Sequence, residues 1–263
     1  MKRAYIDIPE VQVHYRTEGS GKPFLLLHQT ALSSTEYMRV IPILARRYRV
    51  IAMDTPGYGG SDLPPRAYQV EDYAKCVVNF LKAMGIGKTS IVGHHTGAAI
   101  ALEVAASHSE MVDKLILSGC PYYTPEMRKE RLSNPKFRPM EIKDDGSHLI
   151  RPWRSLATRY SGRANLEKAH IIFTNYLLAG PRGEEGHHAV FRYESERRLP
   201  LIKSPTLLLY GTKDTFYERR EATRNLIAQC QIKIIEGGDN FIIFDMPQNF
   251  TQAILEFTQN SEI

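Results

Sequence analysis

The sequence predicts an α/β fold, a mostly parallel eight-stranded sheet flanked by helices and interrupted by one helical segment. Short apolar runs such as residues 24–27 and 206–210 alternate with stretches of helical periodicity, which is the succession that builds parallel sheets. The alternation stops once, between Pro121 and about Pro200, where prolines punctuate a helix-rich stretch. A sharp turn, Gly93-His94-His95-Thr96-Gly97, also joins an apolar strand directly to a small-residue helix.

The first part of the chain contains six expected strands. Pro9 separates the opening antiparallel pair, and Gly85 ends an amphipathic helix. The continuous apolar run at 24–27 is typical of a parallel strand covered on both faces. We expect strands at 5–8, 11–16, 24–27, 48–53, 91–92 and 114–117, with helices at 37–46, 70–84 and 97–106.

The second part contains the interruption and the return of the alternation. Helices are expected at 125–132, 152–160, 166–178 and 184–197, then strands at 206–210 and 231–235 and helices at 218–228 and 247–259. These elements predict a core domain formed by residues 1–120 and 204–263. Residues 121–203 would form a helical lid inserted after the sixth strand.

Composition places the protein among ordinary globular chains. Its 263 residues are 43% hydrophobic and 24% charged, enough for one sizeable domain. The cysteines are odd in number and lack paired or metal-ligand spacing, so we expect buried thiols at Cys76, Cys120 and Cys230. Neither a signal-peptide apolar region nor a membrane-length apolar run is evident, which favours a cytoplasmic protein without membrane contact.

The charge distribution bears on partners. The formal net charge is +5, but the basic residues are scattered among acidic ones, so nucleic acid is not an expected partner. Residues 121–203 hold 16 Lys and Arg against 10 Asp and Glu. This local excess is compatible with a solvated helical surface and also with attraction of an anionic small-molecule substrate.

Five motifs occur in order, each in a strand or turn context. They resemble the α/β-hydrolase superfamily over essentially the whole chain, and the resemblance implies the α/β-hydrolase fold. The motifs are Leu25-Leu26-Leu27-His28-Gln29, the D-x-x-G-x-G-x-S-D-like loop at 54–62, the nucleophile-elbow turn at 93–97, Gly211-Thr212-Lys213-Asp214, and the segment 235–247.

The chain departs from the superfamily pattern at three positions. His95 stands at the nucleophile position, Asn240 at the position of the triad histidine, and Gln29 where glycine is usual beside the oxyanion hole. Only the acid, Asp214, stands where the pattern expects it. Because acyl transfer by a Ser-His-Asp triad needs a hydroxyl or thiol and a base, we do not expect a serine-hydrolase mechanism.

The substituted triad predicts a site built around His95. Asp214 would accept a hydrogen bond from the Asn240 amide, whose oxygen would accept one from the His95 ring; alternatively, Asp214 contacts His95 through water. A histidine ordinarily titrates near pH 6.5 and suits general acid–base catalysis. Backbone N–H groups of Thr30 and Thr96 would form the oxyanion hole that the resemblance implies.

Several chemistries remain open. His95 could activate water against an ester, lactone or activated C–C bond, or abstract a proton in a lyase or isomerase reaction; a covalent nucleophile ranks lower. The protein could also be an inactive relative that only binds a ligand. No cofactor is expected, and a homodimer is open because superfamily members often dimerise.

The remaining histidines are expected to be structural or peripheral. His94 should point away from His95 and be satisfied internally. His28 and Gln29 lie at the carboxyl edge of the sheet, where ligands bind, so they are candidate substrate-binding residues, although bracing the oxyanion loop is the favoured role of His28. At most one of His187 and His188 should reach the pocket, since helical neighbours point about 100° apart. No metal-ligand spacing is present.

Overall fold

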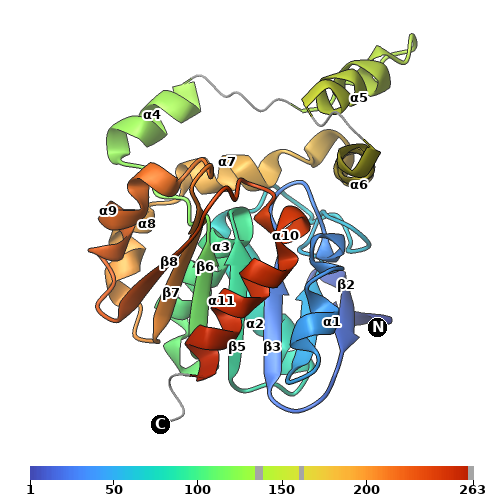
Figure 1. Ribbon diagram of the computed structural model, residues 1–263. Helices are drawn as coiled ribbons and strands as arrows, with labels where there is room; N and C mark the ends of the chain where they lie inside the picture. The colour runs from blue at the N-terminus through green and yellow to red at the C-terminus, as the bar shows by residue number, and fades with distance from the viewer. Residues whose placement is uncertain (134–138, 160–162, 260–263) are drawn as a thin grey trace.

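The computed structural model describes residues 1–133, 139–159 and 163–259. Eight strands form one sheet in the order β1-β2-β4-β3-β5-β6-β7-β8 (Figure 1). The first two pairings are antiparallel and all later ones parallel, which confirms the predicted fold class. The strands are β1 Lys2–Ile8, β2 Val11–Glu18, β3 Pro23–Leu27, β4 Arg49–Met53, β5 Thr89–His94, β6 Val112–Ser118, β7 Thr206–Gly211 and β8 Cys230–Ile235.

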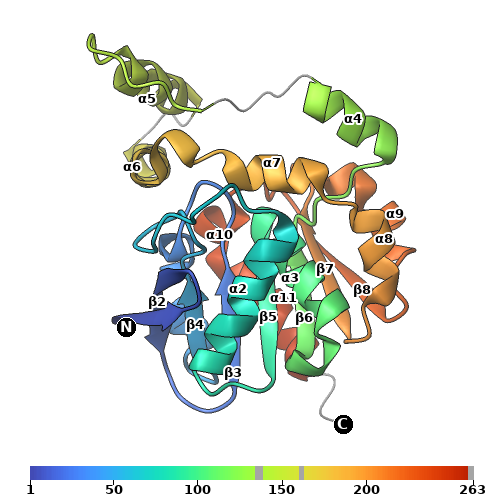
Figure 2. The same ribbon diagram turned by 180° about the vertical axis from the view of Figure 1, so that it is seen from behind.

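Helices cover both faces of the sheet. Figure 2 shows α2 (Val70–Ala83) and α3 (Thr96–Ser107) on one face, and Figure 1 shows α1 (Ile41–Leu44) and α11 (Pro247–Gln259) on the other. The buried apolar side chains accordingly form two clusters, one on each side of the strands. Every residue of β5 and β7 is buried, because strands covered on both faces need apolar side chains in both directions.

The segment between β6 and β7 is helical and crosses the carboxyl edge of the sheet (Figures 1 and 2). We call residues 121–203 the helical insertion. α4 packs against α7, α5 packs against α6, and α7 also contacts α3 and α2. The helices are α4 Pro125–Ser133, α5 Ser147–Arg159, α6 Arg163–Ala179, α7 Glu185–Arg192 and α8 Ser195–Arg198.

Helix α7 lies close to the loop that follows β3. A Cβ atom on Gly186 would approach the Thr30 hydroxyl to 2.1 Å and the Tyr58 hydroxyl to 2.8 Å. The Tyr58 hydroxyl accepts from the Gly186 N–H at 2.9 Å and donates to the Gly183 carbonyl at 3.1 Å. Glycine at position 186 therefore allows the helical insertion to close over the carboxyl edge.

The short helices differ from the sequence prediction. The helix expected at 37–46 is a 3-10 turn, η1 (Ser34–Tyr37), followed by the four-residue α1, and the helix expected at 218–228 is η5 (Tyr217–Arg219) followed by α9 (Arg220–Arg224). The helix expected at 184–197 is broken at Tyr193, whose backbone is extended. α10 (Ile242–Asp245) was not predicted. Tyr160, the expected end of α5, lies outside the described residues.

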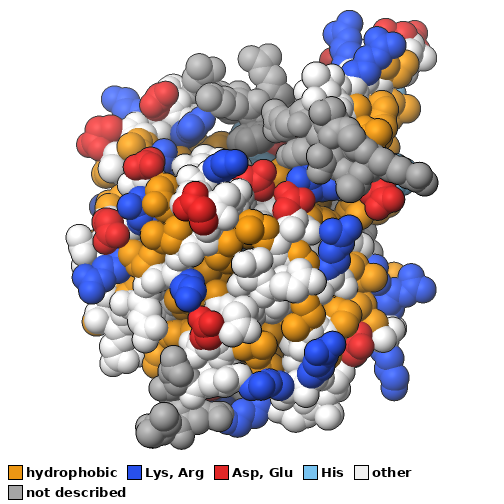
Figure 3. Space-filling model, viewed as in Figure 1, with side chains coloured by type: hydrophobic (Ala, Val, Ile, Leu, Met, Phe, Trp, Pro, Cys, Tyr) orange, Lys and Arg blue, Asp and Glu red, His pale blue; other side chains and the backbone are white. Residues whose placement is uncertain are grey.

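Three further observations concern the surface charge, the length of the helices and the thiols. Acidic and basic side chains are interspersed on the face shown in Figure 3. Within the described residues, none of the helices is long and apolar enough to cross a membrane. Cys76 and Cys120 are buried as predicted, whereas Cys230, at the start of edge strand β8, is only half-buried.

Candidate active site

His95 occupies the turn between β5 and α3. Its φ of 48° lies in the left-handed region, which is uncommon for residues other than glycine. The flanking glycines allow the turn, since a Cβ on Gly93 would meet the Gly97 carbonyl oxygen at 2.1 Å, and one on Gly97 would meet the Leu27 carbonyl oxygen at the same distance. The turn therefore projects His95 from the carboxyl end of a central strand.

Asp214 contacts the His95 ring directly. The Nε2 atom of His95 lies 2.8 Å from Oδ2 of Asp214, and the Phe216 N–H donates to the other carboxylate oxygen at 2.7 Å. Burial alone would raise the pKa of Asp214, but the His95 charge and these hydrogen bonds hold it below its usual value. The carboxylate is therefore ionised and accepts the Nε2 proton, which leaves Nδ1 of a neutral ring as the basic nitrogen.

The part of the His95 side chain that Asp214 does not contact borders accessible space. The His95 side chain is 13% exposed and lines a cavity of about 400 Å³. In the described part of the chain, Nδ1 has no hydrogen-bond partner. Phe216 packs edge-on against the ring at 5.3 Å between centroids. The ring is thus held from one side and open on the other.

Asn240 does not connect Asp214 to His95, and the predicted hydrogen-bond chain is wrong. Its side-chain oxygen accepts from the Thr215 N–H at 2.9 Å, and its amide nitrogen donates to the Thr215 hydroxyl at 2.8 Å. The water-bridged alternative is also wrong, since Asp214 and His95 are in direct contact. The physical reason is that the loop turns the Asn240 amide toward Thr215, while its backbone carbonyl faces the elbow.

His94 is a satisfied structural histidine, as predicted, but it does not point away from His95, because the two ring centroids lie only 4.5 Å apart. Its side chain is fully buried; Nε2 donates to the Asn240 carbonyl at 3.0 Å and Nδ1 accepts from the Ser118 hydroxyl at 2.9 Å. Burial, with a smaller contribution from the His95 charge, lowers the pKa of His94 to about 3. The ring therefore stays neutral and links β5, β6 and the loop at residue 240.

His28 is not among the residues that line the cavity, contrary to its candidacy as a substrate-binding residue. It is 2% exposed, its Nδ1 donates to the Gln29 carbonyl at 2.9 Å, and its Nε2 accepts from the Thr55 N–H at 3.0 Å. Both ring nitrogens of His28 are therefore engaged in hydrogen bonds to the backbone, which agrees with a role in bracing the loop after β3. Gln29 does line the cavity, although its amide is held by Glu36 and the Asn240 carbonyl.

Thr30 and Thr96, the expected oxyanion donors, both line the cavity. Thr96 is the first residue of α3, and the first N–H groups of a helix lack an intrahelical acceptor. The helix dipole adds a favourable potential for an anion there. The Thr30 hydroxyl is buried without a hydrogen-bond partner among the described residues, at the contact with Gly186.

The cavity wall combines aromatic and polar groups from the core and the helical insertion. Its described lining contains no Asp or Glu, and Arg131 of α4 is its one side chain with a fixed charge. Arg131 has no ion-pair partner within the described residues. The lining is Gln29, Thr30, His95, Thr96, Pro121, Tyr123, Arg131, His187, Val190, Phe191, Thr215, Phe216, Asn240 and Phe241.

Some of the residues that line this cavity were predicted from the sequence. At most one of the two adjacent histidines of the insertion was expected to reach the pocket, and the residue that lines it is His187. Three other arginines of the helical insertion, Arg151, Arg154 and Arg192, do not line the cavity. Arg131 carried no sequence signal, because it lies on a short polar helix whose direction depends on tertiary packing. In the described ranges, no cluster of three or more His, Cys, Asp or Glu could hold a metal ion.

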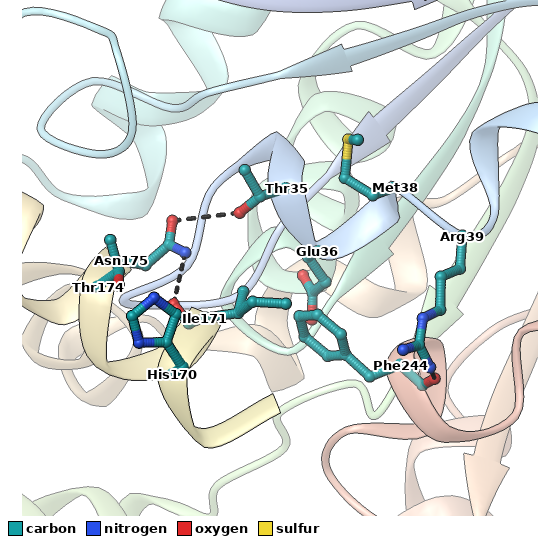
Figure 4. A pocket seen from close by; sticks show the side chains of 9 residues that line it. All are labelled: Thr35, Glu36, Met38, Arg39, His170, Ile171, Thr174, Asn175 and Phe244. Atoms are coloured by element: carbon teal, nitrogen blue, oxygen red, sulfur yellow. Dashed lines mark hydrogen bonds between the residues drawn. The ribbon is translucent and has the colours of Figure 1, made fainter. Parts of the chain in front are cut away.

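A second cavity of about 330 Å³ lies behind the loop after β3, between η1, α6 and the Phe244 side chain of α10 (Figure 4). Glu36 forms part of its wall and is 1% exposed. Its carboxylate accepts from the Gln29 N–H at 3.0 Å and from the Gln29 amide at 2.8 Å. Burial, partly offset by these bonds, raises the pKa of Glu36 to about 7.

Comparison with known proteins agrees with this architecture. A family model described as alpha/beta hydrolase fold matches residues 22–246. A 2-hydroxy-6-oxo-6-(2'-aminophenyl)hexa-2,4-dienoic acid hydrolase from Metapseudomonas resinovorans is 29% identical over 96% of this chain and 89% of its own. A soluble epoxide hydrolase from Corynebacterium sp. (strain C12) is 34% identical over 40% of this chain and 37% of its own.

Among solved structures, the enol-lactonase from Burkholderia xenovorans LB400 superposes with a TM-score of 0.80 over 97% of this chain and 99% of that one. At 17% sequence identity this similarity supports the fold alone. The chain belongs to the α/β-hydrolase fold family. Together with hydrolase relatives of similar length, this membership makes it a hydrolase-fold enzyme.

Proposed function

We propose that this protein hydrolyses a small carbonyl-containing compound, an ester, lactone or activated C–C bond, with His95 as general base. One observation carries the proposal: Nε2 of His95 is held by the Asp214 carboxylate at 2.8 Å, while the rest of the ring borders the cavity. A base needs an oriented ring with one nitrogen available to water. His95 and Asp214 supply this arrangement without a serine and without a second histidine.

The reaction requires no cofactor. Nδ1 of His95 takes a proton from water, and the resulting hydroxide oxygen bonds to the carbonyl carbon as the C=O π electrons move to oxygen. Asp214 stabilises the imidazolium, and the N–H groups of Thr30 and Thr96 stabilise the oxyanion. Collapse expels the alcohol or carbon leaving group, which takes the proton back from His95 and restores the neutral ring.

The substrate we propose carries a negative charge, and the helical insertion acts as the lid that closes over it. Arg131 is positioned on the cavity wall, the described lining has no opposing carboxylate, and a guanidinium pairs well with a carboxylate. The named compound of the M. resinovorans relative is an oxo acid. We therefore favour oxo acids, or esters and lactones that also carry a free carboxylate.

The function is tested by turnover of a panel of esters, lactones and β-diketones, each with and without a carboxylate, by the native protein and His95→Ala in parallel. We expect the native protein to hydrolyse at least one class and the variant to lose at least about tenfold in kcat/KM. Equal near-background rates for both proteins across the panel would contradict hydrolysis. Product analysis identifies a lyase or isomerase, and binding without turnover identifies the inactive relative.

A further inference from the structure

A buried carboxylate clamps the residue that departs from the family pattern beside the predicted oxyanion hole. Glu36 of η1 uses one carboxylate oxygen for the Gln29 N–H and the other for the Gln29 side-chain amide, at 3.0 and 2.8 Å. Two parallel bonds to an ionised group fix both the backbone and the side chain of a residue. The Glu36 side chain is completely buried, so solvent does not compete for these bonds.

The clamp continues into the elbow. The Gln29 amide also donates to the Asn240 carbonyl at 3.1 Å, and that carbonyl accepts from His94 at 3.0 Å. On the far side of the His94 ring, the Ser118 hydroxyl donates to Nδ1, and the Ser118 carbonyl accepts the His95 N–H at 2.9 Å. One continuous network therefore joins Glu36 to the backbone of His95.

We propose that Glu36 is a positioning residue of the active site, whose ionised carboxylate holds Gln29, and through it the Thr30 N–H, in the place needed to receive the oxyanion. This inference rests on the proposed function of the same site. Glu36 does not line the cavity that His95 borders, so it acts through Gln29 rather than on the substrate.

Protonation would release the clamp. With both oxygens accepting N–H bonds, an added proton displaces one donor, because a protonated carboxyl oxygen becomes a donor itself. The pKa of Glu36 is raised to about 7 by burial, so the change falls within the working pH range. The charged or titratable groups around it are His94 at 3.9 Å, His95 through its charge, the adjacent Tyr37, and Arg39 and His170, which line the second cavity from the turn after η1 and from α6.

The decisive experiment follows the backbone amide resonance of Thr30 by ¹⁵N NMR between pH 5.5 and 8.5. We expect a titration with a midpoint near pH 7 in the native protein, a titration in His95→Ala as well, and its loss in Glu36→Gln, which has no titrating carboxylate and one acceptor oxygen in place of two. Glu103→Gln is the matched control, since Glu103 is a buried carboxylate bonded to Tyr193 and Arg198 instead; it should titrate like the native protein.

Kinetics give the second readout, using a substrate from the panel above. We expect Glu36→Gln to lower kcat at least about tenfold at pH 8, with KM changed less than about threefold. Gln29→Gly, which removes the side-chain half of the clamp, should lower kcat less, and the double variant should cost about as much as Glu36→Gln alone, because coupled residues are not additive.

A Thr30 resonance that titrates identically in the native protein and Glu36→Gln would overturn the positioning role, as would one that does not titrate in the native protein. A kcat in Glu36→Gln within about twofold of that of Glu103→Gln at every pH would also overturn it. If no protein turns over any substrate, the proposed function fails. The NMR titration still decides whether Glu36 sets the Thr30 backbone.

Discussion

At the scale of single residues, the direct contact between His95 and Asp214 determines which ring nitrogen is left to act. The carboxylate fixes the proton on Nε2, so the tautomer needed for a base at Nδ1 is set by the protein. The side chain of Asn240, which we expected to link Asp214 to His95, instead bonds Thr215, and only its backbone carbonyl joins the network.

Asp214→Asn is predicted to lower kcat/KM by at least about 10²-fold, because a neutral amide neither fixes the tautomer nor stabilises the imidazolium. Asn240→Ala should cost much less, below about tenfold, since its side chain does not reach His95. Steady-state kinetics on the same substrate check both. A larger loss in Asn240→Ala than in Asp214→Asn would reverse the roles assigned to the two residues.

Arg131→Gln is predicted to raise KM at least about tenfold for a substrate with a carboxylate, while changing it less than about twofold for the neutral analogue. The reason is that Arg131 supplies the fixed positive charge of the described cavity wall. The matched control is Arg154→Gln, whose side chain is exposed on α5 away from the lining. Equal effects of Arg131→Gln on both substrates would remove the anionic preference.

At the scale of elements, the approach of α7 to the loop after β3 couples the helical insertion to the site. Gly186→Ala places a Cβ where the Thr30 hydroxyl lies, and overpacking of this kind typically costs about 1–3 kcal/mol. We expect a lower free energy of unfolding and a lower kcat/KM together. Gly87→Ala, where nothing lies within 4 Å of the added Cβ, should change neither quantity. A Gly186→Ala protein with native stability and native kcat/KM would show that α7 can shift away from the loop after β3 without cost.

Elements with a strong sequence pattern were predicted well, and short ones were not. The prediction for 247–259 coincides with α11, and 70–84 agrees with α2 within one residue, because both have long periodic apolar faces. α10 has only four residues, too few for periodicity to be read. The 218–228 helix is shorter than expected because its second half turns away after Arg224, which depends on packing rather than on local pattern.

At the scale of the whole molecule, the buried carboxylate of Asp54 makes the stability of the folded protein depend on pH. Asp54 holds the loop at 54–62 to β2 and η1 through hydrogen bonds from His14, Ser34 and Gly60. Burial opposes ionisation, but these bonds prevail and lower the pKa of Asp54 to about 2. Because the folded pKa lies below the usual value, this stabilisation is present above about pH 4 and disappears as pH falls through about 2.

Asp54→Asn is therefore predicted to be less stable than the native protein by about 2–3 kcal/mol between pH 5 and 7. The difference should shrink as the pH approaches 2, which denaturant unfolding at a series of pH values measures. Asp113→Asn, at an exposed ion pair with Lys88, serves as control with a small effect. A difference for Asp54→Asn that stays constant down to pH 2 would contradict the lowered pKa.

The sequence predicted the sheet, the place of the helical insertion and the elbow, because each leaves a local pattern. It also placed His95, Thr30, Thr96 and Gln29, which line one cavity, near one another. It did not predict the direct His95–Asp214 bond or the clamp of Gln29 by Glu36. Those contacts join segments whose relative orientation is fixed only when the strands and loops are assembled.

The role of His95 as the base of the reaction is tested most directly by imidazole rescue of His95→Ala. We predict that the variant loses at least about tenfold in kcat/KM and that added imidazole restores turnover in proportion to its concentration, because a free base can enter the vacated space. Native-like turnover in His95→Ala without imidazole would show that His95 is not the base.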